Sequence, residues 1–470
     1  MIVLCPKCGA KNRVTDPQEP GRKYFCGTCN TRLPLAPKAP VADGERGVIP
    51  QVGRLDRAEH VRVGKPAASK SLAARVVTWL KEREERNQLV FLLALLALLL
   101  HLFVTPYGDL PIFDEHHYVP EARSIIHQEE LTIPEHPPLG KLFIACGIYV
   151  FGDNPWGWRV PPTIFAVASV VLFYLICRRL AGQWAALLAS LLFIFESLTF
   201  VLSGLAMLNV FSLTFMLLAF LFYLQDRYVL SGVSLALSGI CKMTGLLGGL
   251  VILVHWFITR RRHSPQNIGF FLASAFVAFM LLMPLFDFAA TREWLNPIDR
   301  VWDMVVTHRT LTFEKLTPEQ LSQASYPWEW ILDPTGFRFP DIQYNAQISL
   351  TVWILIIPSM GYMVYEFARR KTDAALFALL WFAATYLLWI PLVLVTDRQS
   401  YIFNFYLTLG AVCIAIGFIM MRFWEVSSKG RFAKRRRLIG ATLIGYLVLH
   451  VILFVVFAPI LPALVSYLQD

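Results

Sequence analysis

The run LVFLLALLALLLHLFV at residues 89–104 decides the class of this chain. It contains no Asp, Glu, Lys or Arg, and neither does VPPTIFAVASVVLFYLI at residues 160–176. A bilayer core about 30 Å thick is crossed by roughly 20 apolar residues as a helix, because a helix satisfies its own backbone polar groups. These two runs therefore predict an integral membrane protein.

The composition of the whole chain agrees with this class. Of 470 residues, 56% are hydrophobic, and the mean hydropathy is +0.52. A soluble domain averages about 45–50% apolar residues, so this excess favours a membrane protein, and nearly all of it lies after residue 87. The net charge is +10, and residues 1–86 carry 17 Lys or Arg against 9 Asp or Glu. A basic tail can bind nucleic acid, but we prefer a cytoplasmic segment that follows the positive-inside bias.

The hydropathy pattern predicts an all-α polytopic domain at residues 88–470. We expect eleven membrane segments, near 88–104, 159–177, 183–200, 205–223, 229–242, 244–258, 268–288, 346–367, 374–394, 401–421 and 438–458. The loops predicted to face inward are basic. The two long outer loops, 105–158 and 289–345, each carry eight acidic residues, against two and five basic ones. This asymmetry predicts a cytoplasmic N-terminus, and the odd number of segments then puts the C-terminus outside. We expect a multi-pass protein of the plasma membrane.

Four cysteines near the start of the chain predict a zinc module at residues 1–35. They form the pairs CPKC and CGTC, and they are Cys5, Cys8, Cys26 and Cys29. Two such pairs about 15–20 residues apart suit a tetrahedral zinc ribbon, whose metal supplies folding free energy. The module could bind a cytosolic partner or steady the N-terminus. Residues 36–87 follow as a linker, whose end at 70–87 is either an amphipathic juxtamembrane helix or an extension of the first span.

The stretch IFDEHHYVPEARSIIHQEELTIPEHPPLGKLF at residues 112–143 is dense in ionisable side chains for an outer loop. Its His and acidic residues could ligate a catalytic divalent metal. Alternatively, Asp114 is a general base and nearby cations hold an anionic substrate. For any single residue, a solvated acidic loop is the competing interpretation. We also expect interrupted helices near Gly204, Asn209 and Lys242, which a membrane protein tolerates only around a cavity or a protein core.

These motifs resemble the protein O-mannosyltransferase family, phospholipid carrier-dependent membrane glycosyltransferases of GT-C architecture. The resemblance is carried by FDEHHY, EHPPLGK and NPWGWRVPP, covers roughly residues 88–458, and is strongest over 112–165. Later segments match more loosely. They are GICKMTGLLG around Lys242, YPWEW at 326–330 and RQSYIFNFY at 398–406.

The resemblance implies that a hexose, such as mannose, passes from a polyprenyl-phosphate donor to a hydroxyl acceptor at the outer face, with inversion. The acceptor is Ser or Thr of an exported protein, or a lipid or glycan, and the donor's long chain stays in the lipid bilayer. The resemblance implies Asp114 as the base, with Glu115 orienting the base or the acceptor. The candidate ligands of the donor phosphate or the substrate are His117, His136, Lys141, Arg159, Lys242 and Arg398. Because phosphate leaves readily, we expect no requirement for a catalytic metal.

Two departures from the family pattern affect the acceptor and the sugar. Gly204 and Asn209 stand where the family pattern predicts an arginine and an aspartate, and the second long outer loop lacks the family's large insertion. Two rival functions remain open. A transporter would explain an intramembrane lysine but predicts inverted repeats, of which the sequence gives no sign. A non-catalytic relative would act as a membrane scaffold through its zinc module.

Overall fold

The computed structural model describes residues 2–4, 11–13, 72–260, 264–333, 337–338, 345–427 and 436–469. The chain divides into two compact units, Met1–Lys70 and Ser71–Asp470. In the first unit, strands β1 (Ile2–Leu4) and β2 (Lys11–Arg13) pair antiparallel, with Ile2 opposite Arg13. The four cysteines of the predicted zinc ribbon lie outside the described residues, so the zinc site stays a prediction.

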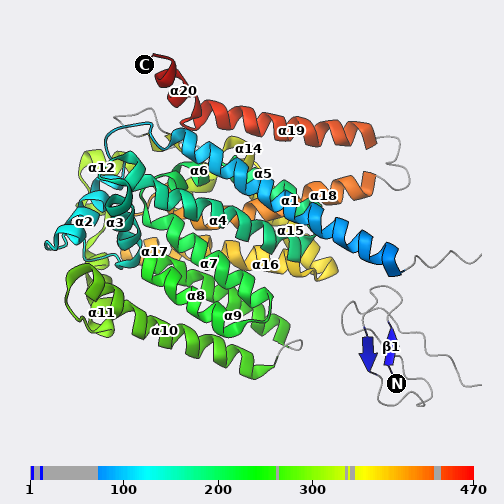
Figure 1. Cartoon of the computed structure of the whole chain (residues 1–470), viewed down its shortest axis with the longest axis horizontal. Helices are drawn as coiled ribbons and strands as arrows, with labels where there is room; N and C mark the ends of the chain where they lie inside the picture. Colours follow the sequence, from blue (N-terminus) through cyan, green and yellow to red (C-terminus); the bar gives the residue numbers. More distant parts are fainter. Residues whose placement is uncertain are drawn as a thin grey trace, which may run out of the picture. The chain divides into compact units, whose positions relative to one another are not determined.

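The second unit is built almost entirely of helices (Figure 1). Its first half contains α1 (Leu72–Val104), α2 (Glu115–His127), α3 (Leu139–Phe151), α4 (Pro155–Ala181), α5 (Gln183–Ile194), α6 (Ser197–Gly204), α7 (Leu208–Leu224), α8 (Tyr228–Cys241), η1 (Met243–Leu246), α9 (Leu247–Thr259) and α10 (Pro265–Thr291). Its second half contains α11 (Pro297–Thr310), η3 (Phe313–Lys315), α12 (Pro318–Gln323), α13 (Glu329–Leu332), β3 (Phe337–Arg338), β4 (Asn345–Ala346), α14 (Leu350–Trp353), α15 (Ile356–Arg370), α16 (Asp373–Phe382), η4 (Ala383–Leu387), α17 (Trp389–Thr396), η5 (Ile402–Thr408), α18 (Leu409–Ser427), α19 (Arg436–Phe457) and α20 (Ile460–Gln469).

The prediction of a polytopic all-α domain is confirmed. Within the described residues, six helices are long and apolar enough to cross a membrane, or seven if the bent pair α5 and α6 forms one span. Shorter apolar helices, among them α7, α8 and η1 with α9, occupy the remaining predicted segments of the first half. The predicted number of eleven spans is therefore not decided by helix length alone. Residues 72–104 form one continuous helix, which matches the alternative of an extended first span.

The helices of the central region are interrupted where the sequence predicts it. Helix α6 ends at Gly204 and α7 begins at Leu208, leaving an extended step between them. Helix α8 ends at Cys241, and Lys242 follows with an extended backbone at φ −157° and ψ 127°. Helices α5 and α6 are bent by 64° at their junction. Each interruption frees backbone polar groups at membrane depth, and these need partners from the protein.

The two long loops lie together at one end of the bundle. The first loop contains helices α2 and α3, so the predicted helical first loop is confirmed. The second contains α11, η3, α12 and α13, and Figure 1 draws α2, α3, α11 and α12 at the same end. The ring of His136 lies 5.6 Å from that of His308, which joins the two loops directly. This end of the bundle carries the candidate site.

Small residues bring the helices beneath the site close together. A Cβ on Gly417 of α18 would lie 2.8 Å from the carbonyl oxygen of Ala185 in α5. A Cβ on Gly410 would lie 2.3 Å from the ring of Trp381. Close packing of this kind contributes to the association of helices in a membrane, where lipid is as apolar as the side chains.

Candidate active site

Asp114 stands at the start of α2 with a carboxylate that the helix does not use. It is the N-cap residue, but its side chain makes no capping hydrogen bond. Its backbone is helical, at φ −65° and ψ −8°, whereas most N-caps are extended so that the side chain can reach the first turn. Phe113 before it lies in the left-handed region at φ 52°, a conformation that surrounding structure must hold in place for so bulky a residue. The turn at Phe113 therefore leaves the Asp114 carboxylate available for chemistry.

Glu115, the next residue, is fully buried and holds the interrupted helices together. Its carboxylate accepts two hydrogen bonds from the guanidinium of Arg159, at 3.0 and 2.8 Å. It also accepts the backbone N–H of Ile112 at 2.9 Å and that of Ala206 at 2.8 Å. Ala206 lies in the gap between α6 and α7, so Glu115 satisfies a backbone donor that the broken helix leaves free.

Arg159 is also buried, and it fastens the first long loop to α4. Besides Glu115, it donates to a series of backbone carbonyl oxygens of the loop, which are those of Thr105, Tyr107, Gly108 and Leu110. An arginine has five N–H donors, and these contacts engage Nε, Nη1 and Nη2 alike. The structure therefore places Arg159 beneath the loop, and its donors are directed at the protein.

Lys141 forms a second buried pair in the same loop. Its Nζ donates to Glu121 Oε2 at 2.7 Å and to the carbonyl oxygen of Ile133, and both side chains are 1% exposed. Glu121 also accepts the hydroxyl of Thr132 at 2.8 Å and the N–H of Ile133 at 3.0 Å. Burial raises the pKa of Glu121, but Lys141 and Thr132 bring it below its ordinary value, so the pair stays charged. Since Glu121 belongs to α2 and Lys141 to α3, this ion pair joins the two helices and fixes the segment between them.

Gly140, in the HPPLGK segment, allows α3 to approach α7 and α8. A Cβ at this position would lie 2.7 Å from Leu208 Cδ2 and 3.5 Å from the carbonyl oxygen of Cys241. Leu208 and Cys241 immediately precede Asn209 and Lys242 in the chain. The absence of a side chain at Gly140 therefore brings the first loop against the Asn209–Lys242 pair.

Lys242 is a buried cation held by a neutral partner. Its Nζ donates to Asn209 Oδ1 at 2.7 Å and lies 5.2 Å from the ring centre of Phe403. The face of an aromatic ring attracts a cation, so Phe403 helps to hold the ammonium group in place. Phe403 also contacts Phe113, with ring centres 5.4 Å apart, which ties this cation to the turn that presents Asp114.

Arg398 and His308 add further polar groups from other parts of the chain. Residues 311–313 pair with 397–399, with a β-bridge between Thr312 and Arg398, so the second long loop fixes the arginine. Arg398 Nη2 donates to His308 Nδ1 at 3.0 Å, and Nη1 donates to the His308 carbonyl oxygen. Since Nδ1 accepts, His308 is neutral, in agreement with burial lowering its pKa to about 4.

The electrostatic environment of Asp114 suits a base. Burial raises the pKa of the Asp114 carboxyl above its ordinary value of 3.8, while the charges of Lys242 and His117 lower it. A carboxylate with a raised pKa accepts a proton more readily. His117 itself is exposed on α2. Burial and the nearby cations, Lys242 foremost, hold the pKa of His136 well below its ordinary range, so His136 is neutral.

The predicted residues thus fall into two groups. Asp114, His117, His136, Lys242 and Arg398 belong to one charged region, in which Lys242 and His117 act on Asp114, and Lys242 and Arg398 act on His136. Glu115, Lys141 and Arg159 lie in buried ion pairs that hold the first long loop in place. Within the described ranges, no group of three or more His, Cys, Asp or Glu side chains is arranged to hold a metal ion.

Comparisons with known proteins show what the chain is similar to. Residues 135–286 match the family model for dolichyl-phosphate-mannose-protein mannosyltransferase. A polyprenol-phosphate-mannose–protein mannosyltransferase of Mycolicibacterium smegmatis is 37% identical over 124 residues, 25% of this chain and 24% of that protein. The Corynebacterium glutamicum protein of the same name is 22% identical over 444 residues, with 74% of this chain and 84% of that protein covered. The match thus covers about a quarter of the length of the first relative.

Solved structures show the same fold. The S. cerevisiae protein O-mannosyltransferase Pmt1–Pmt2 complex bound to the sugar donor matches with a TM-score of 0.67 at 12% identity, covering 80% of this chain and 90% of that chain. ArnT from Cupriavidus metallidurans in the apo state matches with a TM-score of 0.55 at 14% identity, covering 81% and 77%. The chain is similar in sequence to protein O-mannosyltransferases over part of its length. Its membrane domain has the GT-C fold.

The match to the mannosyltransferase family model includes only part of the site. It contains His136, Lys141, Arg159 and Lys242, but it begins after Asp114 and ends before Arg398. The positions of these last two residues in the site therefore come from the geometry of this chain. The structure brings them to one region from segments that are 284 residues apart (398 − 114).

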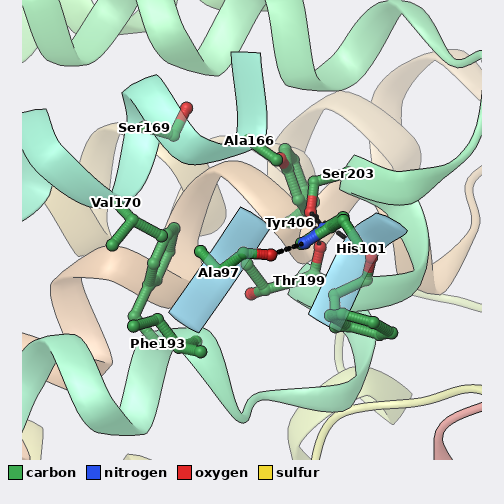
Figure 2. Close-up of a pocket in the computed structure, with 11 residues that line it drawn as sticks. Ala97, His101, Ala166, Ser169, Val170, Phe193, Thr199, Ser203 and Tyr406 are labelled. Carbon is green, nitrogen blue, oxygen red and sulfur yellow. Dashed lines mark hydrogen bonds between the residues drawn. The ribbon is translucent and has the colours of Figure 1, made fainter. Parts of the chain in front are cut away.

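Gly204, where the mannosyltransferase pattern predicts an arginine, borders a cavity. Figure 2 shows a neighbouring cavity lined by His101, Thr199, Ser203 and Tyr406 among others. The cavity that Gly204 borders is a different one, and it is also lined by His101, Thr105 and Arg159 together with apolar side chains. A Cβ at Gly204 would lie 3.4 Å from His101 Cδ2, so a longer side chain would have to share this space with the imidazole. These cavities do not contain Asp114.

Three contributors to the site are not evident from the sequence. His308 lies in the second long loop within WDMVVTHRT, where a single histidine on an amphipathic helix gives little sign of a role. The sequence around Asn209 favours a packing residue, and Phe403 belongs to an aromatic-rich segment typical of a membrane interface. Only the pairing of Asn209 and Phe403 with Lys242 distinguishes them, and that pairing exists only in the folded chain.

Proposed function

We propose that this chain is an inverting glycosyltransferase that moves mannose, or another hexose, from a polyprenyl-phosphate donor to a hydroxyl group. The acceptor we favour is a Ser or Thr side chain of an exported protein. The observation that carries the proposal is the Asp114 carboxylate, which makes no capping hydrogen bond and lies near the cation Lys242, with Arg398 close to Lys242 in turn. The mannosyltransferase relatives described above support the donor and the sugar.

The reaction needs one base and a cationic site for the leaving group. The acceptor oxygen forms a bond to the anomeric carbon, and its proton passes to the Asp114 carboxylate. The bond between that carbon and the phosphate oxygen breaks, and its electron pair leaves with the polyprenyl phosphate. Phosphate is a competent leaving group, so a second catalytic carboxylate of the glycosidase kind is not needed. Cations placed beside the phosphate stabilise the charge that develops on it.

Lys242 and Arg398 are the phosphate ligands that this geometry favours. Lys242 Nζ has three N–H donors, of which one is directed at Asn209. Two of the five donors of Arg398 are directed at His308, which leaves others for a bidentate contact with phosphate. For Lys141 and Arg159, buried and paired with Glu121 and Glu115, we replace the predicted phosphate contact with a positioning role. His117 and His136 are then the neighbours of base and substrate.

The test is sugar transfer in membranes that contain the protein and labelled polyprenyl-phosphate mannose. We expect the wild-type protein to label an exported-protein acceptor, and Asp114→Asn to lose transfer by roughly 100-fold or more, the contribution of a positioned base. Asp109→Asn is the matched control, because Asp109 is exposed in the same loop. Equal transfer by Asp114→Asn and wild type, at equal protein level, would rule out the assignment of the base. A wild-type protein without transfer would favour the scaffold.

The proposal places the site at the outer face of the plasma membrane, with the N-terminus in the cytoplasm. The loops predicted to face the cytoplasm are rich in Lys and Arg, and the positive-inside bias therefore supports this orientation. A cysteine introduced at Glu129, exposed in the first long loop, should react with a membrane-impermeant maleimide added outside intact cells. Reaction only after the membrane is opened would reverse the orientation and remove the site from exported acceptors.

We also propose that Cys5, Cys8, Cys26 and Cys29 bind one structural zinc ion. Thiolate pairs of this spacing are suited to tetrahedral zinc. Metal analysis of the purified protein should give about one zinc per chain, and a Cys5→Ser, Cys26→Ser variant should lose it. Deleting residues 1–40 should leave transfer nearly unchanged, because the module contributes no residue to the proposed chemistry. A cytosolic partner of the module would then be sought with the isolated tail as bait.

A further inference from the structure

Three buried cations lie in or below the candidate site, and one of them differs from the others in its partner. Arg159 forms an ion pair with Glu115 at 2.8 Å, and Lys141 forms one with Glu121 at 2.7 Å. Lys242 instead donates to the amide oxygen of Asn209 at 2.7 Å. In the part of the chain that the structure describes, no carboxylate lies within 4.0 Å of Lys242 Nζ.

A buried charge without a direct ion pair is unfavourable, because the protein interior solvates it poorly. The Asp114 carboxylate acts on the charge of Lys242, but from beyond the distance of an ion pair. Intramembrane and buried cations of this kind usually mark the path or the site of a ligand. Lys242 is only 8% exposed, and Asn209 is 4% exposed. An anionic ligand would supply the direct ion pair that Lys242 lacks, and the proposed donor carries a phosphate.

The position of Asn209 suits a role in aiming the lysine. Asn209 lies in the first turn of α7, directly after the gap between α6 and α7, and it is fixed there by the helix. Lys242 is the C-cap residue of α8, and its backbone is fixed by hydrogen bonds to Ser238 and Gly245, whereas its long side chain has further freedom of its own. The hydrogen bond to Asn209 and the contact with the Phe403 ring therefore determine where the ammonium group lies.

The asparagine at position 209 also differs in charge from an aspartate, which has nearly the same shape. A carboxylate at position 209 would accept the same hydrogen bond but would neutralise Lys242 and compete with a phosphate for it. An amide oxygen fixes the ammonium group and leaves its positive charge in place.

We propose that Asn209 is a positioning residue that aims Lys242 at the donor phosphate while preserving its charge. This inference rests on the proposed function of the site. It gives a physical role to the residue that stands where the family pattern predicts an aspartate. The amide at 209 thereby tunes the affinity of the site for its lipid-phosphate donor.

The test compares Asn209→Asp and Asn209→Ala with wild type in the full-length protein. For Asn209→Asp we expect the KM for polyprenyl-phosphate mannose to rise roughly 10- to 100-fold, the loss of one charge-assisted contact, with a smaller change in kcat. Polyprenyl phosphate without sugar should compete correspondingly less well. Asn209→Ala removes the hydrogen bond that positions Lys242 but leaves the charge of Lys242 in place. Its KM for the donor should therefore rise less, by about three- to tenfold.

Asn296→Asp is the matched control. Asn296 is an exposed N-cap of α11 at the same end of the bundle, and an aspartate can cap a helix equally well. Elution as a single species and an unchanged thermal midpoint identify folded variants, and the comparison of Asn209→Ala with wild type stands alone if Asn209→Asp does not fold.

The outcomes separate the inference from the proposed function. If the wild type transfers sugar and Asn209→Asp retains the wild-type KM and competition by polyprenyl phosphate, Asn209 does not preserve the charge of Lys242. A larger KM effect in Asn209→Ala than in Asn209→Asp would also overturn the inference, since it would show that shape and not charge matters. Absence of transfer by the wild type contradicts the proposed function itself.

Discussion

Arg159 Nη2 donates to Glu115 Oε2 over 2.8 Å, and both side chains are shielded from solvent. The two residues are 44 positions apart, and they join the start of α4 to the start of α2. Because the same carboxylate accepts the N–H of Ala206, the pair also supports the gap between α6 and α7. Glu115 is thus a structural neighbour of Asp114, and the two adjacent acids have different roles.

The first prediction concerns the stability of this pair. Glu115→Gln leaves the Arg159 charge buried without its counterion, which typically costs about 3–5 kcal/mol. We expect a clear fall in the thermal midpoint, measured by fluorescence-detected gel filtration after heating. Asp153→Asn is the control, since its ion pair with Arg123 at 2.8 Å is largely exposed and such pairs contribute about 0–1 kcal/mol. Equal midpoints for the two variants would argue against a structural role for the pair.

The second prediction concerns the pH dependence of transfer. Asp114 must be ionised to accept a proton, and burial raises its pKa above 3.8, so transfer should fall as the pH drops through this raised pKa. The charge of Lys242 lowers that pKa. Lys242→Gln should therefore move the acidic limb of the kcat/KM profile to higher pH.

Lys315→Gln, at an exposed position, is the control for this profile. His308, with a pKa of about 4, titrates in the same range, so the profile of His308→Gln identifies its contribution. An acidic limb that stays in place, or moves to lower pH, in Lys242→Gln would contradict the proximity of this cation to the base.

The third prediction concerns the fit of Gly140. In Gly140→Ala the new Cβ meets Leu208 Cδ2 at 2.7 Å, so either the Leu208 side chain must turn aside within its buried surroundings or the first loop must move away from α7. We expect transfer to fall roughly tenfold, since a small displacement of a catalytic group has effects of this size or larger. A second substitution, Leu208→Ala, makes room and should restore part of the activity. Gly361→Ala is the control, because a methyl group at that position would have no neighbouring atom within 4 Å.

Two results would contradict this prediction, one for the single variant and one for the double variant. Wild-type transfer by Gly140→Ala would mean that close approach at this glycine is not needed. Failure of Leu208→Ala to improve Gly140→Ala would mean that the damage arises elsewhere than at this contact.

The fourth prediction concerns the guanidinium of Arg398. Arg398→Lys keeps the positive charge but loses the planar pair of donors, including those to His308. We expect the KM for the donor to rise about three- to tenfold, measured with labelled polyprenyl-phosphate mannose. Arg309→Lys, exposed one residue after His308, should leave the KM unchanged. An unchanged KM in Arg398→Lys would show that Arg398 contributes charge alone or is not a phosphate ligand.

Much of this protein follows from local patterns in its sequence. Apolar runs of helical length specify the membrane domain, because lipid offers no partner for an unpaired backbone group. The helical first loop and the interruptions near Gly204, Asn209 and Lys242 are equally local, because they reflect residues that do not continue a simple apolar helix. The motif FDEHHY also singles out Asp114 without reference to any distant residue.

Tertiary structure alone decided how the charged residues divide the work. Asp114 and Glu115 are neighbours in sequence. The Asp114 side chain makes no capping hydrogen bond and lies near the cation Lys242, whereas the Glu115 carboxylate is buried against Arg159. Lys141, Arg159 and Lys242 are all cations in apolar surroundings, and only folding gives two of them a carboxylate and the third an amide. The strength of an interaction between charges depends on distance and on exclusion of water, and both are properties of the folded chain.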